Sequence, residues 1–489
     1  MATGDLDLVL RSIIDELATA TAPNFNIIHD RLVPAIKIPS ISSERTVEGR
    51  KHVVAMTDFL TDQLTNLNAS VDRHSLGKEP ETELQLPDVI IAKYPKMYES
   101  KKKTILIYGH YDVQPPGEGW DTDPWTITEK GEDPDKKLYG RGSTDDKGPV
   151  LGWLNALQAY QEAKVDVPVN LIFCFEGMEE SGSTGFAEFA IANRALFEHV
   201  DAACISDNYW LTTKKPCLTY GLRGINYFNL TVEHAGVQLH SGMFGGCVYE
   251  PMTDLVILLS KLVDSQGKIL IPGINELVDD VSKEEAEEYA TIEFSTRDFQ
   301  QTIGSDANIY DDPKKTLMHR FRYPSLTIHG IAGADSSPDQ TTAIYPKVTA
   351  KFSIRTVPSM DQETVSNLTI NYLCQEFEKL GSKNTCTAKQ FGETAPYWLA
   401  SPDDANYKAG KAATQKVYHT EPDLTREGGS IGVTLDLQKA LGEKSIMLLP
   451  VGMSDDAAHG PNEKLNKTNY IEGSKLQGAY WWYFANPQS

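Results

Sequence analysis

The sequence predicts an α/β fold, with a mostly parallel central sheet flanked by helices and an inserted α+β domain. Short apolar runs alternate with helical periodicity in residues 1–216 and again in residues 397–489. This pattern is typical of a parallel sheet that helices cover on both faces. In residues 217–396 the order of expected elements changes to β-α-β-β-α-β, which is ferredoxin-like. Because 489 residues also exceed one ordinary core, we expect a two-segment domain, 1–216 and 397–489, interrupted by a second domain.

The first segment is expected to contribute most of the sheet. The apolar residues Leu6, Val9, Ile13, Ile14 and Leu17 recur with helical spacing and predict an amphipathic helix at the N-terminus. Short apolar runs followed by polar or glycine residues predict the strands, and helical patterns lie between them. The expected strands span residues 104–108, 169–173 and 202–206, and the expected helices span 47–67, 149–163 and 183–194.

The insert and the last segment follow the same logic with different element orders. In the insert we expect strands at 227–232, 325–329, 348–357 and 385–391, and helices at 251–263 and 362–380. An acidic tract at 276–288 is expected to be a solvated helix face. In the last segment we expect helices at 402–417, 431–441 and 470–484, and a strand at 446–450.

Composition and charge exclude several classes of partner. The formal net charge is -22, which opposes binding to nucleic acid and to anionic membranes. No apolar run is long enough to span a bilayer, and Asp5 and Asp7 stand where a signal peptide would carry basic residues. The six cysteines are scattered without a C-x-x-C pair, as expected for buried reduced thiols. We therefore expect a cytoplasmic protein that binds neither nucleic acid nor membranes.

Side chains that can bind metal follow the carboxyl ends of the predicted strands, where α/β sheets place their sites. They lie at five places along the chain: His110 with Asp112, Asp145 with Asp146, Glu179 with Glu180, Asp207, and His459. A single Asp or His after a strand is usually a turn former, but five such places are hard to explain as turns. Mixed imidazole and carboxylate ligands suit zinc or manganese better than magnesium or calcium.

The adjacent glutamates Glu179 and Glu180 suggest a division of labour. Gly177 and Gly182 allow tight turns around them, and neighbouring side chains in an extended segment point in opposite directions. One carboxylate could therefore bind a metal while the other moves protons. When this stretch is taken alone, a charged loop after a strand is the plainer alternative.

Nine motifs, spread in order over most of the chain, resemble the M20 family of metallopeptidases, in particular its cytosolic non-specific dipeptidases and Cys-Gly dipeptidases. They are GHYDVQP (109–115), LYGRGSTDDKGPV (138–150), CFEGMEESGS (174–183), CISDNYWL (204–211), TYGLRG (219–224), LHSGMFGG (239–246), KFSIRTVP (351–358), DLTREGGSIGVTL (423–435) and LLPVGMSDDAAHGPNEKLN (448–466). The resemblance implies a zinc-peptidase-like catalytic domain with an inserted lid and dimerisation domain. It also implies hydrolysis of dipeptides, including Cys-Gly from glutathione breakdown.

The resemblance further implies two divalent metal ions per subunit, Zn²⁺ or Mn²⁺, that share a bridging Asp145. His110 and Asp207 would complete the protein ligands of one ion, and Glu180 and His459 those of the other. Asp112 would hold His110 through its second ring nitrogen, a common arrangement around metal-bound histidines. Glu179 would be the general base, and the bond between Asp145 and Asp146 is typically cis in this family.

The inserted domain would provide the remaining functional residues of a homodimer. His240 resembles the residue that reaches the site of the partner subunit and stabilises the oxyanion. Arg355 would bind the C-terminal carboxylate of the substrate, for which a guanidinium is a natural bidentate partner. Ser430 and Thr342 would complete that anchor.

Alternatives from other classes remain. Within the family, relatives hydrolyse N-acyl amino acids or act as carboxypeptidases. Residues 428–432 match the G-x-S-x-G motif of serine hydrolases around Ser430, with Asp455, Asp456 and His459 downstream; however, a polar run precedes this serine where the motif requires an apolar strand. A non-catalytic metal-binding scaffold is the third alternative, although every residue that the family's chemistry uses is present.

Overall fold

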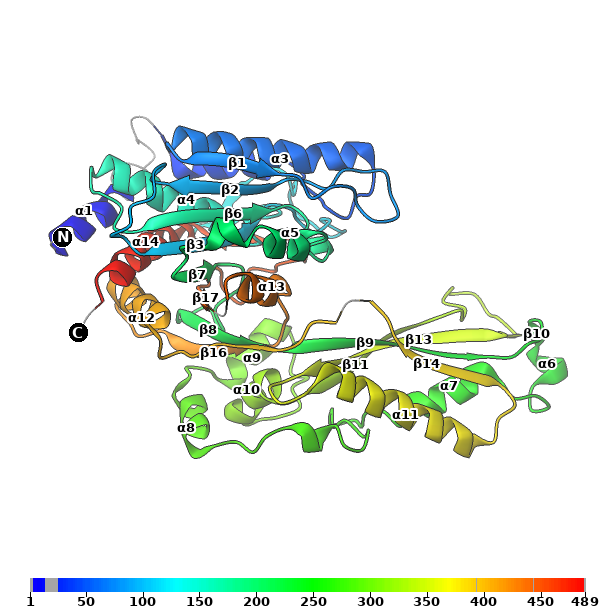
Figure 1. Cartoon of the computed structure of the whole chain (residues 1–489). Coiled ribbons are helices and arrows are strands. Elements are labelled where there is room, and N and C mark those ends of the chain that lie inside the picture. Colours follow the sequence, from blue (N-terminus) through cyan, green and yellow to red (C-terminus); the bar gives the residue numbers. More distant parts are fainter. Residues whose placement is uncertain (1–2, 14–24, 393, 443, 488–489) are drawn as a thin grey trace.

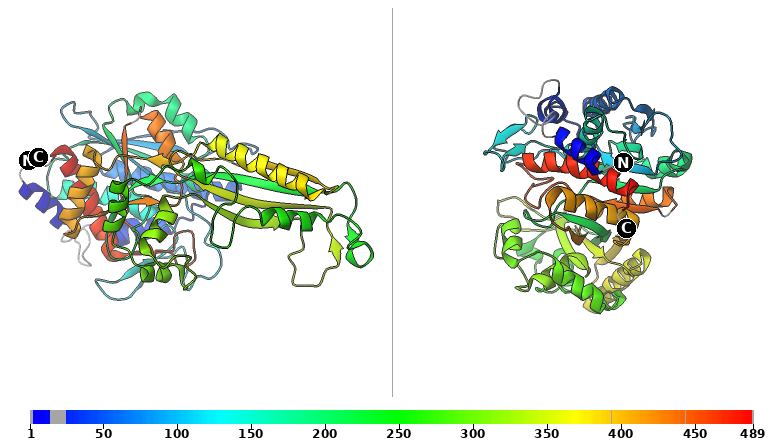
Figure 2. Two further views of the ribbon diagram at one scale, coloured as in Figure 1. Left: turned by 90° about the horizontal axis from the view of Figure 1, so that it is seen from below. Right: turned by 90° about the vertical axis from the view of Figure 1, so that its left-hand side faces the viewer.

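The computed structural model describes residues 3–13, 25–392, 394–442 and 444–487. A layered α/β part contains a nine-stranded sheet, and an elongated second part contains a four-stranded sheet. Figures 1 and 2 show the second part extending away from the first, with both chain termini at the far side of the first part. Within the described residues, the structure contains no helix with the length and apolar character needed to cross a membrane.

The large sheet is mixed. In spatial order its strands are β1 (Ser70–His74), β2 (Val89–Tyr94), β6 (Asn170–Glu176), β3 (Thr104–His110), β7 (Ala202–Ile205), β17 (Ser445–Leu448), β8 (Cys217–Leu222) and β15 (Trp398–Leu399), and β16 (Asp423–Glu427) also pairs with β8. Only the centre, β6-β3-β7-β17, and the β8-β16 pair are parallel. The expectation of a mostly parallel sheet therefore holds for its centre. The links from β2 to β3 and from β7 to β8 contain no crossover helix, so the chain reverses direction there.

Side chains along the central strands alternate between two buried clusters. In β3, Ile105 and Ile107 face one cluster, and Leu106 and Tyr108 face the other. The first face is covered by α1 (Thr3–Ser12), α3 (Val47–Asn66), α4 (Lys147–Glu162), α12 (Ala405–Tyr418) and α14 (Lys467–Ala485). The opposite face is covered by α5 (Phe186–Ala192) and α13 (Val433–Ala440). The last part of the predicted N-terminal helix, including Ile14 and Leu17, lies outside the described residues.

The second part has the predicted β-α-β-β-α-β order. Its antiparallel sheet runs β11 (Ser325–Ala332), β13 (Lys347–Thr356), β9 (Gly224–Glu233), β14 (Thr385–Gln390), and α7 (Pro251–Leu259) and α11 (Gln362–Leu380) pack on one face. Phe228 and Phe352 stack between strands at the centre of this core, with ring centroids 5.0 Å apart. Since the chain-order strands one to four lie in the spatial order 4-1-3-2, the arrangement is ferredoxin-like.

Three helices follow α7: α8 (Lys283–Thr291), α9 (Thr296–Ile303) and α10 (Pro313–Phe321). The first overlaps the acidic tract that we expected to be a helix face, whereas α9 and α10 were not predicted. Leu317 and Phe321 of α10 form a small core with Leu211 from the first part. The acidic tract is not wholly solvated, because Glu285 pairs with Arg322 at 2.8 Å and with Arg426 at 3.2 Å. These contacts attach the three helices to the large sheet.

The position of β8 bears on the expected domain boundary. We expected the insert to begin at residue 217, but β8 (Cys217–Leu222) is hydrogen-bonded within the large sheet. The chain leaves that sheet at Arg223 and enters β9 at Gly224. The division into domains itself stays a prediction.

Two small sheets complete the fold, β10 (Leu239–His240) with β12 (Ala343–Ile344), and β18 (Lys464–Asn466) with β5 (Lys137–Tyr139) and β4 (Thr128–Lys130). The short helices α2 (Val33–Ile36) and α6 (Ser241–Phe244) lie in the connections.

Candidate metal centre

The parallel centre of the large sheet brings the predicted metal ligands together. His110 is the last residue of β3, and Asp207 follows β7 by two residues. Because β6, β3 and β7 are parallel neighbours, their carboxyl ends meet at one edge of the sheet. Asp145 lies at the same edge, in the turn that precedes α4. The turn requires glycine at position 148, because a Cβ there would lie 1.9 Å from the Ser143 carbonyl oxygen.

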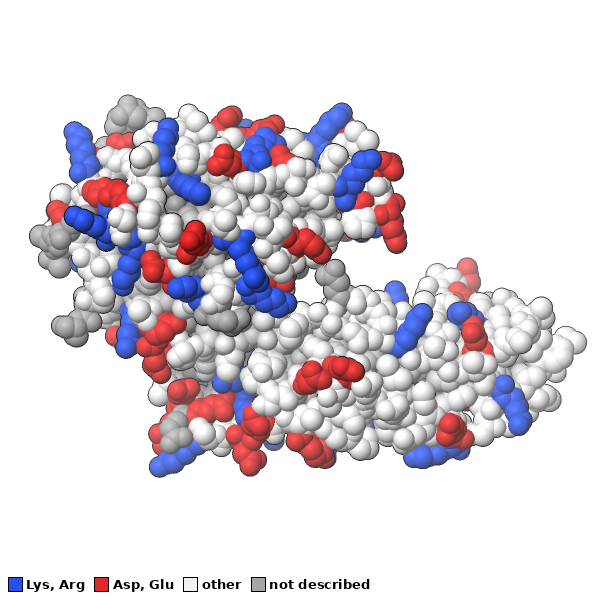
Figure 3. Space-filling model, in the orientation of Figure 1, with Lys and Arg blue, Asp and Glu red and all other residues white. Residues whose placement is uncertain are grey.

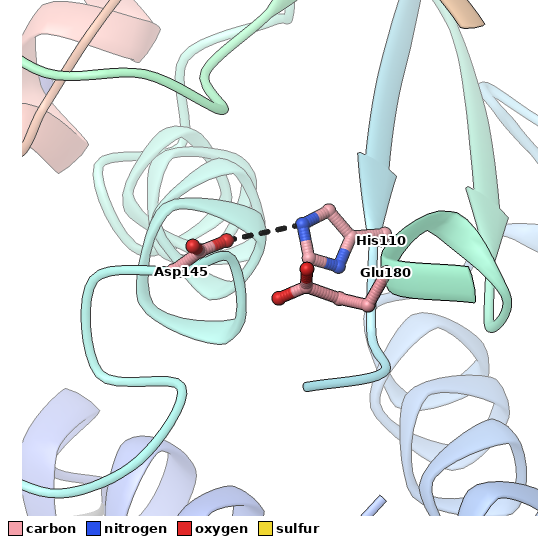
Figure 4. A group of neighbouring side chains, drawn as sticks. All are labelled: His110, Asp145 and Glu180. Atoms are coloured by element: carbon pink, nitrogen blue, oxygen red, sulfur yellow. Dashed lines mark ion pairs between the residues drawn. The ribbon is translucent and has the colours of Figure 1, made fainter. Parts of the chain in front are cut away.

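Asp145 lies between the two histidines. Its Oδ1 is 3.2 Å from His110 Nε2, and its Oδ2 is 2.9 Å from His459 Nε2. Asp207 Oδ1 lies 3.5 Å from His110 Nε2, and Glu180 Oε2 lies 3.2 Å from His459 Nε2. Figure 4 shows the carboxylate of Asp145, at the start of α4, directed toward the ring of His110. The side chains therefore form two sets that share Asp145.

The geometry of these side chains is compatible with bound cations. Ligand atoms of His110, Asp145 and Glu180 all lie within 4.8 Å of one another, and so do those of His110, Asp146 and Asp207. His110 Nε2 is buried without a hydrogen-bond partner, and Asp146 Oδ1 also has none. The peptide bond between Asp145 and Asp146 is cis, as the resemblance implied.

The charge balance of the cluster also favours cations. Seven carboxylates are buried or nearly buried at this edge: Asp112, Asp145, Asp146, Glu176, Glu179, Glu180 and Asp207. Burial raises the pKa of Asp207 to about 6, against the opposing effect of His110. Hydrogen bonds to Asp145 and Glu180 raise the pKa of His459 to about 11. Divalent cations would provide the positive charge that such a cluster needs in order to stay ionised.

Asp112 organises the residues around His110. Its Oδ1 accepts a hydrogen bond from the Glu179 amide at 3.2 Å, and its Oδ2 accepts one from the Glu180 amide at 3.1 Å. His110 Nδ1 lies 3.1 Å from the Asp112 carbonyl oxygen and 3.4 Å from its carboxylate. Asp112 thus fixes both the imidazole and the turn that carries the two glutamates.

The two glutamates make different contacts, although they lie in a short 3₁₀ helix (Glu179–Ser181) and not in the extended segment that we expected. Glu180 faces His459, and it also accepts a hydrogen bond from Gln114 Nε2 at 2.9 Å. Glu179 Oε2 lies 4.0 Å from His110 Nε2 and lines an open pocket. Burial raises the pKa of Glu179 well above its usual range, and the charge of Asp207 adds to this effect while His110 opposes it. A raised pKa is typical of carboxylates that exchange protons at neutral pH.

A pocket of about 440 Å³ lies over the cluster. Its lining residues come from both parts of the molecule and include Asp145, Glu179, Asp207, Thr302, Arg320, Glu427, Ser430 and His459. Thr302 belongs to α9 and Arg320 to α10. The helices α9 and α10 therefore help to build the wall opposite the sheet.

Ser430 connects this pocket to Arg355 on β13. Arg355 Nη1 donates to Ser430 Oγ at 2.9 Å, and Ser430 Oγ donates to the carbonyl oxygen of Arg223. Arg355 forms no salt bridge with any of the described residues. The serine-hydrolase alternative is wrong, because the hydroxyl of Ser430 is engaged by an arginine and a carbonyl while His459 Nε2 faces carboxylates.

The structure does not bring His240 and Thr342 to the metal centre of the same chain. The two side chains lie together, with Thr342 Oγ1 3.3 Å from His240 Nε2, on the β10-β12 ribbon. Figure 1 shows this ribbon at the end of the second part that is remote from the large sheet. Both residues are exposed.

Two residues near the site were not singled out from the sequence. Gln114 Nε2 donates a hydrogen bond to Glu180 at 2.9 Å, and Glu463 accepts one from the Asp145 amide at 3.1 Å. Asp146, which was among the candidates from the sequence, accepts a hydrogen bond from the His110 amide through its Oδ2 at 3.3 Å. Gln114 and Glu463 stand inside motifs quoted above, but a polar residue in a turn gives no sign that it will be buried.

Comparison with known proteins establishes the family. Residues 106–482 match the family model "Peptidase family M20/M25/M40". The chain is 46% identical over 455 residues to a Cys-Gly metallodipeptidase of Schizosaccharomyces pombe, covering 92% of this chain and 94% of that protein. It is 40% identical over 452 residues to the Beta-Ala-His dipeptidase of Homo sapiens, covering 91% and 88%. The solved structure of the dipeptidase Dug1p from Saccharomyces cerevisiae superposes with a TM-score of 0.88 at 43% identity, covering 100% of both chains. The chain belongs to peptidase family M20/M25/M40 and is a metal-dependent hydrolase.

Proposed function

We propose that this enzyme hydrolyses the peptide bond of dipeptides with the help of two divalent cations, Zn²⁺ or Mn²⁺. The observation that carries the proposal is the shared carboxylate of Asp145, whose two oxygens face two different imidazoles. His110, Asp145 and Asp207 would hold one cation. His459, Asp145 and Glu180 would hold the other.

Glu179 is the proposed general base. When bound, two cations would polarise the scissile carbonyl and lower the pKa of the attacking water. Glu179 borders the pocket but has no contact with His459, so its carboxylate is free to take a proton from that water and return it to the leaving amine. The hydrogen bond from the Glu179 amide to Asp112 holds the base in place.

The substrate class rests on the anchor and on the relatives. Arg355 has a partly buried guanidinium that forms no salt bridge within the described residues. Burial lowers its pKa, and the charge of Glu427 opposes this effect. This arrangement favours a ligand that brings its own carboxylate. Free dipeptides, N-acyl amino acids and C-terminal residues of peptides all meet that requirement. Two similar proteins are described as Cys-Gly and Beta-Ala-His dipeptidases, which favours dipeptides, Cys-Gly among them. The free thiols of Cys174, Cys204 and Cys217 support a cytoplasmic enzyme.

A homodimer through the second part would explain the position of His240. Figure 3 shows few charged residues at the far end of that part. Large apolar side chains are exposed there, among them Val237 at 73% and Met243 at 72%. Such a patch is typical of a protein interface. In the dimer, His240 and Thr342 would enter the pocket of the partner subunit, and His240 would stabilise the oxyanion there.

Removal of metal is expected to destabilise the enzyme, because it leaves the carboxylates mutually repelling. A ligand present at 100 times its Kd contributes about 2.7 kcal/mol, so treatment with a chelator should lower Tm by several degrees. Adding back Mn²⁺ or Zn²⁺ alone should restore Tm and show which ion supports turnover. The shift should be smaller in Glu180→Gln. A Tm that is the same with and without chelator and metal would contradict the metal site.

Substitution of Arg355 is expected to act on substrates with a free carboxylate. Arg355→Met should lower kcat/KM for dipeptides by about 10- to 100-fold, the range expected for losing a charge-assisted hydrogen bond. Dipeptide amides should be almost unaffected. The matched control is Lys351→Met, an exposed position on the same strand. An equal loss on dipeptides and their amides would show that Arg355 is structural, and faster hydrolysis of N-acyl amino acids would contradict the dipeptide assignment.

The two glutamates are expected to fail in different ways. Glu179→Gln should bind both cations with unchanged affinity and lose about 10²- to 10⁴-fold in kcat, the usual contribution of a general base. Glu180→Gln should instead lose affinity for one cation. Calorimetric metal titration and steady-state kinetics on both variants separate these effects. A Glu179→Gln enzyme with near wild-type turnover would exclude Glu179 as the base.

Mixing two inactive variants tests whether the site is built across subunits. His240→Ala and Glu179→Gln chains, mixed in equal amounts and allowed to exchange, should regain roughly a quarter of wild-type activity, because each mixed dimer would contain one intact site. The control is either variant carried through exchange alone. If His240 acted within its own chain, the mixture would show no gain.

A further inference from the structure

One buried ion pair joins the loops that carry the candidate metal ligands. Arg141 Nη1 lies 2.6 Å from Glu463 Oε2, and the two side chains are only 1% and 0% exposed. Neither residue lines the pocket over the cluster. A fully buried pair of this kind contributes little net stability as a rule, since desolvation offsets the attraction. Its contacts therefore point to another role.

The carboxylate of Glu463 fixes the backbone that leads into Asp145. Its Oε2 also accepts a hydrogen bond from the Gly142 amide at 3.0 Å. Its Oε1 accepts hydrogen bonds from the amides of Thr144 and Asp145, at 3.0 Å and 3.1 Å. Without this carboxylate, three main-chain donors in the turn would lose their acceptor, so the turn would have to rearrange.

The guanidinium of Arg141 extends the same connection to two further loops. Nη2 donates to the carbonyl oxygen of Gly460 at 2.9 Å and to that of Pro115 at 3.3 Å. Gly460 directly follows the candidate ligand His459. Pro115 directly follows Gln114, which hydrogen-bonds Glu180. The ring of Trp120 lies against the guanidinium, with its centroid 5.5 Å away.

The two ligand sets depend on this connection to different degrees. His110 ends a buried strand and is held by Asp112. His459 lies in a loop, its side chain is 58% exposed, and its backbone φ is +63°, which is uncommon for a residue other than glycine. Arg141 holds the loop around His459 at two points, the carbonyl oxygen of Gly460 and the carboxylate of Glu463.

We propose that Arg141 and Glu463 are positioning residues that set the separation between the two ligand sets. They act through the backbone of the turn at 142–145 and of the loop at 459–463, and they touch neither substrate nor cation. Their loss should displace both His459 and the shared Asp145, while His110 and Asp207 stay in place, so the ion at His459 and Glu180 should be weakened more than the ion at His110 and Asp207. This inference rests on the proposed two-cation site.

The test is a titration of the Glu463→Gln variant with Mn²⁺. Binding is measured by calorimetry and by electron paramagnetic resonance. The side-chain amide of the glutamine has an NH₂ group that must face either Arg141 or the main-chain amides of the turn at 142–145. Because these are all donors, the variant loses its contacts with at least one of the two. The first Mn²⁺ should lose less affinity than the second. The second should bind at least about tenfold more weakly, with loss of the spectrum of a coupled ion pair, and excess Mn²⁺ should restore kcat without changing KM.

A matched control separates positioning from general loss of stability. Glu285→Gln removes a carboxylate that also pairs with arginines, Arg322 and Arg426, but lies outside the loops of the site. It should bind both Mn²⁺ ions as the wild type does. If Glu463→Gln does not fold, Arg141→Lys provides the same readout, because one ammonium cannot reach Glu463 and both carbonyl oxygens at their present positions.

The outcomes are distinct from those of the proposed function. A wild-type enzyme that binds only one ion would contradict the two-cation site itself. A wild-type enzyme that binds two ions, together with a folded Glu463→Gln or Arg141→Lys variant that binds both with unchanged affinities, would overturn the positioning role alone. An equal weakening of both ions would also overturn it, since the inference requires the His459 set to be affected selectively.

Discussion

The shared carboxylate of Asp145 is the constraint on which the rest of the site depends. One side chain must face two imidazoles that are almost 350 residues apart in sequence, one at the end of β3 and one in a loop, so the distance between these two segments has to be fixed. Two features meet this requirement. The parallel centre of the sheet places His110 and Asp207 at one edge, and the buried pair of Arg141 with Glu463 ties the loop of His459 to the turn of Asp145.

Placing this many carboxylates together is costly unless the surroundings stabilise their charge. The protein does so in part with main-chain amides, as at Asp112, which accepts from both residues of the glutamate pair. The imidazoles of His110 and His459 also help, but two imidazoles cannot balance the charge of seven carboxylates. On the proposed function, divalent cations would supply part of the remaining compensation, and cation binding would then be coupled to folding of this edge.

The sequence predicted the position of a functional side chain wherever that side chain directly follows a strand. The ligand candidates could be predicted because an apolar run followed by His, Asp or Glu has few outcomes in an α/β fold. The position of β8 and the antiparallel edges could not, since they depend on which strands pair and not on the pattern within any one of them. Gln114 and Glu463 were missed for a related reason. Their roles come from burial and from donors on distant segments, and neither is encoded locally.

The candidate metal ligands and the residues proposed to bind the substrate come from different parts of the molecule. The cluster that would act on the peptide bond belongs to the large sheet, whereas Arg355 lies on β13 and Thr302 and Arg320 lie on helices inserted before β11. Ser430 stands between them and bonds to both Arg355 and the chain at Arg223, the residue where the backbone leaves the large sheet. The relative placement of the two sheets therefore sets the distance from Arg355 to the candidate metal centre. If Arg355 anchors the substrate carboxylate as proposed, that distance would limit the length of the substrate, and selectivity for short substrates would come from how the two parts are joined and not from the metal ligands.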